Sequence, residues 1–256
     1  MRGEDQHGLR LRLGECSVQL GRLRDAGFVE GTDPSPRRNP RLAKWFGLES
    51  RVYLSSRIAI AAVMIAWLCF VLTAGAGWER ARIARRPGAR MTRDQLAWAG
   101  FAPQASGFGL VWSFRRPTGS ALVDVGLVGQ WCITVAVAIA AFGAAGIGTW
   151  AIRALGRQFA VSARVVDGHE LVTVGPYAHM RNPIYLALAG LLVATGLALS
   201  RGAPLLLGLV LYLAGTHLRA RRKERLLKKA YGVGYETYAR RVPRLLPWPL
   251  WRRRAA

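Results

Sequence analysis

The sequence predicts an all-α, polytopic integral membrane protein with four to five transmembrane helices, a C-terminal helical hairpin and a cytosolic, cofactor-binding tail. Hydrophobic residues make up 52% of the chain, although its formal net charge is +23. The apolar residues form blocks with arginines between them, which is typical of membrane proteins and argues against a nucleic-acid-binding protein. Two apolar runs near the C-terminus are joined by a very short link, which favours an antiparallel helical hairpin.

The N-terminal half is expected to contain an arm, followed by the first membrane spans and a linker in residues 51–149. Residues 1–50 mix charge, glycine and proline, which predicts a flexible basic arm. Residues 58–77 are uncharged and long enough to cross a bilayer core of about 30 Å at about 1.5 Å per residue. A linker with six arginines follows at residues 80–93, and residues 95–114 form a marginal span or a re-entrant segment.

The C-terminal half predicts a further span at residues 125–150 and then the hairpin. Its two helices are expected at residues 184–199 and 204–218, and the second continues to about residue 229 as a basic extension. Residues 150–247 form the predicted catalytic region. Residues 248–256 form a basic tail, where tryptophans beside arginines are expected to bind anionic lipids.

The charge distribution predicts the orientation in the membrane. From Arg219 onward the chain has 13 Lys and Arg against only Glu224 and Glu236, so this tail should be cytoplasmic. Because the predicted hairpin crosses the membrane twice, residues 153–181 should lie on the same face as this tail. Five spans, with the N-terminus outside, would make the 80–93 linker cytoplasmic too, and we favour this arrangement over four spans. The three cysteines show no metal-ligand spacing, so no metal is expected.

The candidate site lies in residues 168–185, GHELVTVGPYAHMRNPIY, which directly precede an apolar run. Polar groups at a membrane face are costly unless they bind something. This segment resembles the signature of the isoprenylcysteine carboxyl methyltransferase and phospholipid methyltransferase families. The resemblance extends upstream to residues 155–159 and downstream to residues 223–227 and 231–238, in order and at compatible spacing.

The resemblance implies a membrane methyltransferase that uses S-adenosyl-L-methionine at the cytoplasmic face of a bacterial-type cell membrane. Arg181, beside a helix N-terminus, suits a carboxylate, and Glu224 suits an ammonium. Arg181 and Arg157 are the predicted catalytic residues. The predicted cofactor-binding residues are His169, Leu171, Val172, Gly175, Pro176, Tyr177, Arg181, Asn182, Pro183, Tyr185, Glu224, Tyr235 and Tyr238.

Some positions depart from the family pattern. Asn182 stands where histidine is frequent, and Lys223 replaces the first acid of an acidic pair whose second member is Glu224. Tyr231, Tyr235 and Tyr238 would share one face if the segment were a single helix, although Gly232 and Gly234 argue for a bend. We interpret this segment as a lid over the cofactor.

The acceptor is expected to be a lipophilic substrate entering from the bilayer, most simply a prenylcysteine-type carboxylate. A phospholipid amine and a thiol remain alternatives. Membrane reductases that bind NADPH resemble this chain in an Arg-x-Pro-x-Tyr segment. They carry an asparagine inside that segment and an acid a few residues after it, whereas Ile184 and Leu188 occupy those positions here. A non-catalytic membrane scaffold is the remaining alternative.

Overall fold

The computed structural model describes residues 40–84, 91–93, 99–117, 126–159, 164–166 and 171–245. The chain divides into two compact units, residues 1–51 and 52–256. Of the first unit, only a helical backbone from Pro40 is described, so the end of the segment expected as an arm is helical. Everything below concerns the second unit.

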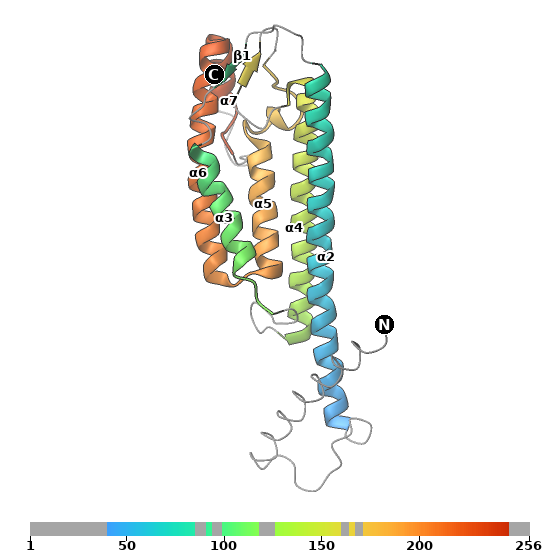
Figure 1. The fold of residues 1–256 in the computed structure, drawn as a ribbon. Helices are drawn as coiled ribbons and strands as arrows, with labels where there is room; N and C mark the ends of the chain where they lie inside the picture. Colours follow the sequence, from blue (N-terminus) through green and yellow to red (C-terminus); the bar gives the residue numbers. More distant parts are fainter. Residues whose placement is uncertain are drawn as a thin grey trace, which may run out of the picture. The chain divides into compact units, whose positions relative to one another are not determined.

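The described part is almost entirely helical, which confirms the predicted fold class (Figure 1). Three helices are long and apolar enough to cross a membrane, and α5 is a shorter apolar helix. One two-stranded antiparallel ribbon, β1–β2, was not predicted. The elements are α2 (Pro40–Ile83), β1 (Met91–Arg93), α3 (Phe101–Ser113), α4 (Gly126–Leu155), η2 (Gly156–Gln158), β2 (Arg164–Val166), η3 (Gly175–Ala178), α5 (Pro183–Leu199), α6 (Gly202–Tyr231) and α7 (Val233–Arg241).

The predicted hairpin is formed by α5 and α6. Pro183 begins α5, Pro204 lies in the first turn of α6, and α6 continues past its apolar part to Tyr231. Proline is favoured in the first turn of a helix because its missing N–H has no intrahelical partner there. We call the end of the hairpin at Ser200 and Arg201 the link end, and the opposite end, where α5 begins, the site end.

The segment at residues 95–114 forms a shorter helix than a full span requires. Helix α3 has 13 residues, about 20 Å at 1.5 Å per residue, against a bilayer core of about 30 Å. It runs antiparallel to α6, because Gly100 lies beside Gly215 and Gly107 beside Gly208. The helices from α2 to α6 alternate in direction, and Gly77 near the end of α2 lies against Ile152 near the end of α4. The basic linker of residues 80–93 therefore begins at the site end.

Glycines allow α3 and α6 to approach each other closely. A Cβ placed on Gly208 would lie 2.7 Å from the carbonyl oxygen of Gly107, and one on Gly215 would lie 2.5 Å from that of Gly100. Real Cβ atoms do not come so close to a backbone oxygen, so only glycine fits at these crossings. This contact brings the beginning of α3 to the basic part of α6.

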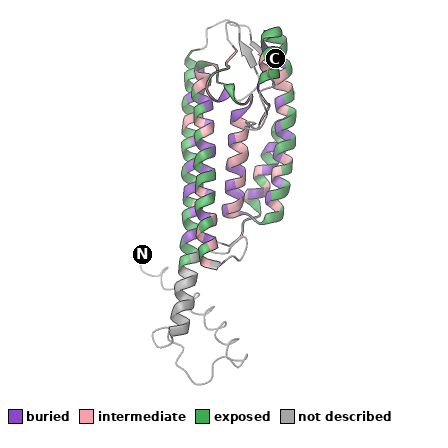
Figure 2. Cartoon of the chain, turned by 180° about the vertical axis from the view of Figure 1, so that it is seen from behind, coloured by how far each residue is buried: buried purple, intermediate pink, exposed green. Residues whose placement is uncertain are grey.

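Helix α5 is the centre of the unit, and Figure 2 shows it as the helix with the least exposed surface. One side of α5 packs on α2 and α4 in a core that includes Val63, Ala141 and Leu191. The other side packs on α3 and α6 around Leu192 and Tyr212. The indole N–H of Trp67 donates to Thr195 Oγ1 at 3.0 Å, which satisfies two polar groups inside this apolar bundle.

The outer faces of α2, α4 and α6 are apolar. Leu72, Ile139 and Leu206 are each more than 60% exposed, and all three lie on helices long enough to cross a membrane. Large exposed apolar surfaces are unusual on soluble monomers and normal where lipid is the solvent. The pattern therefore supports an integral membrane protein.

Candidate functional site

The site end is built from the segment between β2 and α5. Gly175 has φ +62°, a conformation that favours glycine, and Pro176 follows it in the single 3-10 turn of η3. The chain then reaches Asn182, the N-cap of α5, and Pro183. Arg181 is thereby placed at the N-terminus of a buried helix, as predicted.

The C-terminal part folds back over this segment. Gly232, with φ +53°, ends α6 and begins α7, so the bend predicted there is confirmed. After α7 the chain passes the start of α5, where the backbone N–H of Arg181 donates to Pro243 O at 2.9 Å. The side-chain amide of Asn182 donates to Arg244 O at 3.1 Å. Residues 242–245 thus form a strap across the site.

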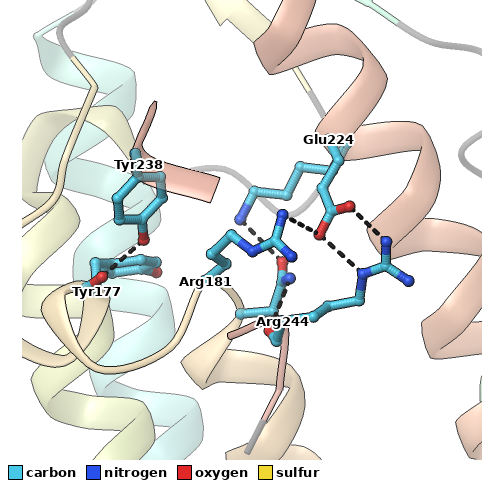
Figure 3. Close-up of polar contacts among 7 residues, drawn as sticks. Tyr177, Arg181, Glu224, Tyr238 and Arg244 are labelled. Carbon is cyan, nitrogen blue, oxygen red and sulfur yellow. Dashed lines mark hydrogen bonds and ion pairs between the residues drawn. The ribbon is translucent and has the colours of Figure 1, made fainter. Parts of the chain in front are cut away.

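Glu224 lies between two arginines (Figure 3). Arg181 Nη1 is 3.2 Å from Oε1 of this carboxylate. Arg244 binds both oxygens, with Nη2 at 2.7 Å from Oε2 and Nε at 3.0 Å from Oε1. The hydrogen bond to Glu224 raises the pKa of Arg244. The Glu224 side chain is only 13% exposed, so α5, α6 and the strap are joined by a largely desolvated ion pair.

Two tyrosines of α7 complete the wall of the site. Their rings, Tyr235 and Tyr238, lie 6.1 Å apart. The Tyr238 hydroxyl donates to the backbone oxygen of Tyr177 at 2.7 Å, which ties α7 to η3 (Figure 3). Burial raises the pKa of all three tyrosines, so they are neutral hydrogen-bonding groups at neutral pH. Tyr231 lies before the predicted break at Gly232, so it does not belong to the same helix as Tyr235 and Tyr238.

Buried polar atoms without a hydrogen-bond partner gather at this end. In the described part of the chain there are four, and three of them are Tyr177 Oη, Arg181 Nε and Tyr235 Oη. An unsatisfied buried polar group costs about 1–3 kcal/mol and needs an explanation. Arg181 and Tyr235 lie near Glu224, and the Tyr177 ring lies near Lys223. These atoms indicate a place at the site end where a polar ligand would supply the missing partners.

Lys223 lies on the other side of Asn182. Its ammonium is 3.4 Å from Asn182 Oδ1 and 5.9 Å from the ring centroid of Tyr177. This long hydrogen bond is the one that the structure gives this ammonium among the described residues. An ammonium has three donors, so its capacity is largely unused.

Arg219, one helical turn before Lys223, is held by α3. Its Nη1 donates to Gln104 Oε1 at 2.7 Å, and Gln104 Nε2 donates to Thr216 Oγ1 at 2.7 Å. The guanidinium lies 5.6 Å from the ring centroid of Phe101 and 5.4 Å from that of Tyr185. Helix α3 is outside the predicted catalytic region of residues 150–247, yet it positions a charge beside the site.

The structure brings most predicted site residues together. Asn182 and Pro183 are buried at the start of α5, and the backbone oxygen of Tyr185 accepts from Tyr212 Oη at 2.8 Å. Arg157 is exposed in η2 and makes no hydrogen bond or ion pair with the described residues. His169 lies outside the described residues. Leu171 and Val172 are partly buried just before η3. The predicted site residues that line or border the ion pair and the tyrosines are Gly175, Pro176, Tyr177, Arg181, Asn182, Glu224, Tyr235 and Tyr238.

Sequence reasoning missed Arg244, Gln104 and the position of Lys223. Arg244 belongs to a run of tail arginines that all look like lipid anchors, so no local pattern distinguishes it. Gln104 is an isolated polar residue in an apolar segment, which is unusual, but the sequence does not show which residue it contacts. Lys223 was noted only as a departure from an acidic pair.

Part of the chain is similar to a known protein family. The model of a family described as phospholipid methyltransferase matches residues 131–234. The match includes Tyr177, Arg181, Lys223 and Glu224 and stops directly before Tyr235. No curated protein gives a significant match to the chain.

Proposed function

Because residues 131–234 belong to the phospholipid methyltransferase family, we propose that the protein transfers a methyl group from S-adenosyl-L-methionine to a lipophilic acceptor that enters from the bilayer. The observation that carries the proposal is the group of unpartnered buried atoms at the site end, Tyr177 Oη, Arg181 Nε and Tyr235 Oη. The family match and this group meet at the same end of the bundle.

The residues present fit the polar part of the cofactor. Glu224 is the acid that would receive its ammonium, and Arg181 would donate to its carboxylate. The tyrosine rings offer aromatic faces to the sulfonium and the adenine. Glu224 already holds two guanidiniums, so the ammonium would compete with Arg244, whose side chain is 33% exposed and easier to displace than Arg181 at 15%.

The chemistry that S-adenosyl-L-methionine supplies when bound is an electrophilic methyl group, whose bond to sulfur breaks with its electron pair on sulfur as the acceptor forms its bond to carbon. The protein's part is to align the acceptor and keep water out. Buried Tyr177 and Tyr235, with the strap at residues 242–245, close the site against water. A carboxylate acceptor is ionised at neutral pH and needs no general base.

For the acceptor, a prenylcysteine-type carboxylate is our first candidate. Arg181, Arg219, Lys223 and Arg244 surround a single acid, Glu224, so the local charge favours an anion. A phospholipid amine is the second candidate, since the family description names phospholipids. Its phosphate would satisfy the same positive field.

The site is proposed to face the cytoplasm. The basic extension of α6, the 80–93 linker and α7 all belong to the site end, where the excess of Lys and Arg predicts the cytoplasmic side. The loop that joins α5 to α6 at the link end carries one arginine, Arg201.

Two measurements test the proposal. The full chain in detergent or nanodiscs is titrated with S-adenosyl-L-methionine and, separately, with NADPH; binding of the first alone is expected. Labelled-methyl transfer is then measured to N-acetyl-S-farnesylcysteine and to phosphatidylethanolamine. Binding of NADPH instead would favour a reductase, and binding of neither would favour a scaffold; either result would reject the proposed function.

A further inference from the structure

We propose that Lys223 is the specificity residue for the acceptor, and that its ammonium binds the acid group of an anionic amphiphile. The inference rests on the proposed function and adds the charge class of the substrate and the residue that selects it. The acid group is the carboxylate of a lipidated acid or the phosphate of a phospholipid, because both present the same anionic oxygens to an ammonium.

The positive charges at the site end are engaged in different ways. Arg181 and Arg244 are both bound to Glu224, so their charge is partly neutralised within the protein. Lys223 has a neutral amide oxygen at 3.4 Å and an aromatic ring at 5.9 Å, and it forms no ion pair with a described residue. Burial lowers its pKa to about 8, and the nearby Glu224 carboxylate, already bound to two arginines, opposes this shift only in part. A partly buried ammonium that keeps its hydrogen-bonding capacity is suited to a ligand anion.

The geometry separates two subsites along α6. Glu224 faces Arg181 and the strap, where Arg181 Nε and the Tyr235 hydroxyl lie. Lys223 faces Asn182 and the Tyr177 ring. The preceding turn presents Arg219 to Tyr185 and to α3. Asn182 connects the two sides, since its amide donates to the strap while its oxygen accepts from Lys223.

From Lys223, a row of polar residues leads along α6 toward the apolar bundle. On α6, Thr216, Arg219 and Lys223 follow at helical spacing, and the first two bind Gln104 of α3. An amphiphile whose tail lies along the bundle would bring its head group to this row of polar residues. Lys223 is at its end nearest to the segment that begins α5, where the acceptor atom would meet the cofactor side.

The test compares Lys223→Gln and Lys223→Arg with Lys228→Gln. Lys228 is on the same helix but is exposed and paired with Glu236 at 2.6 Å, so it controls for loss of charge on α6. Each variant is loaded with S-adenosylhomocysteine, and the dissociation constant is measured for N-acetyl-S-farnesylcysteine and for its carboxamide. A second arm measures methyl transfer to phosphatidylethanolamine and to octadecylamine, which has no phosphate.

Lys223→Gln should weaken binding of the carboxylate about 10-fold, the scale of one charge-assisted hydrogen bond, while the carboxamide changes less than about 2-fold. Lys223→Arg should restore most of the loss, and Lys228→Gln should resemble the wild type. In the second arm, a rise of KM for phosphatidylethanolamine without a change for octadecylamine would identify phosphate as the bound group.

Three results would overturn the inference. An equal loss for carboxylate and carboxamide would mean that Lys223 only supports the fold. A weaker affinity for S-adenosyl-L-methionine with unchanged acceptor binding would assign Lys223 to the cofactor. A fall in kcat with unchanged KM and a shifted pH profile would make it a base. Failure of the proposed function is distinguishable, because the wild type would then bind no S-adenosyl-L-methionine.

Discussion

The two ends of the hairpin solve the problem of a buried arginine differently. At the link end, Arg116 donates through Nη2 to the backbone oxygens of Leu197 and Ala198, the second at 3.2 Å, and so satisfies carbonyls at the C-terminus of α5. At the site end, Arg181 pairs with Glu224 instead. Of the four buried unpartnered atoms in the described chain, one belongs to Arg116 and three to the site end.

This difference separates polar groups that close the fold from polar groups that are left for a ligand. The backbone N–H of Arg116 also binds Leu199 O at 2.9 Å, so the link end completes its turn from within the chain. The buried hydroxyls of Tyr177 and Tyr235 make no well-formed hydrogen bond unless something binds there. Substitutions at the two ends should therefore separate ligand affinity from stability.

Glu224→Gln should have the largest effect. Loss of a charge-assisted hydrogen bond to the ammonium is worth roughly 1.5–3 kcal/mol, so affinity should fall about 10- to 150-fold. Isothermal titration in detergent measures the dissociation constant of S-adenosyl-L-methionine. Glu236→Gln is the matched control, because that acid is also in an ion pair, with Lys228, but lies outside the site on α7. An unchanged dissociation constant for Glu224→Gln would remove this acid from the cofactor site.

Arg181→Lys should cost about 10-fold in methyl transfer. Lysine keeps the charge but loses the planar fork that binds a carboxylate through two N–H groups, and about 1.4 kcal/mol corresponds to one factor of ten. Steady-state kinetics with both substrates varied will assign the loss to the cofactor or to the acceptor. Wild-type turnover in this variant would mean that Arg181 serves only to hold Glu224.

Tyr235→Phe and Tyr238→Phe form a matched pair on one helix. The Tyr235 hydroxyl makes no hydrogen bond of good geometry, although the Arg181 guanidinium lies near enough to lower its pKa. Its removal should therefore leave the free energy of unfolding nearly unchanged and weaken the cofactor a few-fold. The Tyr238 hydroxyl binds Tyr177 O, so its removal should lower the free energy of unfolding by about 1 kcal/mol.

Thermal unfolding in detergent, combined with titration of the cofactor, measures both quantities for each tyrosine variant. The opposite pattern, with Tyr235→Phe destabilising and cofactor affinity intact, would show that the unpartnered hydroxyl is a structural group after all.

Arg116→Met should leave cofactor affinity unaffected. It removes the guanidinium from the end of α5 and leaves two backbone oxygens unsatisfied, so stability should fall by about 1–3 kcal/mol. Thermal unfolding measures the stability of this variant, and titration with S-adenosyl-L-methionine, expressed per folded molecule, measures its cofactor affinity. A fall in affinity comparable to that of Arg181→Lys would contradict the division between the two ends.

Much of the fold was predictable because its causes are local. The length of an apolar run fixes whether a helix can cross the bilayer, and the short link between residues 199 and 204 leaves only an antiparallel hairpin. Gly232 and Pro183 mark a bend and a helix start through their own backbone restrictions. The Gly-Pro-Tyr and Arg-Asn-Pro segment was recognisable because its residues are adjacent in the chain.

The partners of the charged groups were decided only by the tertiary structure. The sequence offers 37 Lys and Arg against 14 Asp and Glu, so it cannot show that Glu224 selects Arg181 and Arg244. It also cannot show that α3 reaches Arg219 through Gln104, since these residues are more than a hundred positions apart. A hydrogen bond or ion pair depends on distances of a few ångströms, and helix packing sets these only after the chain has folded.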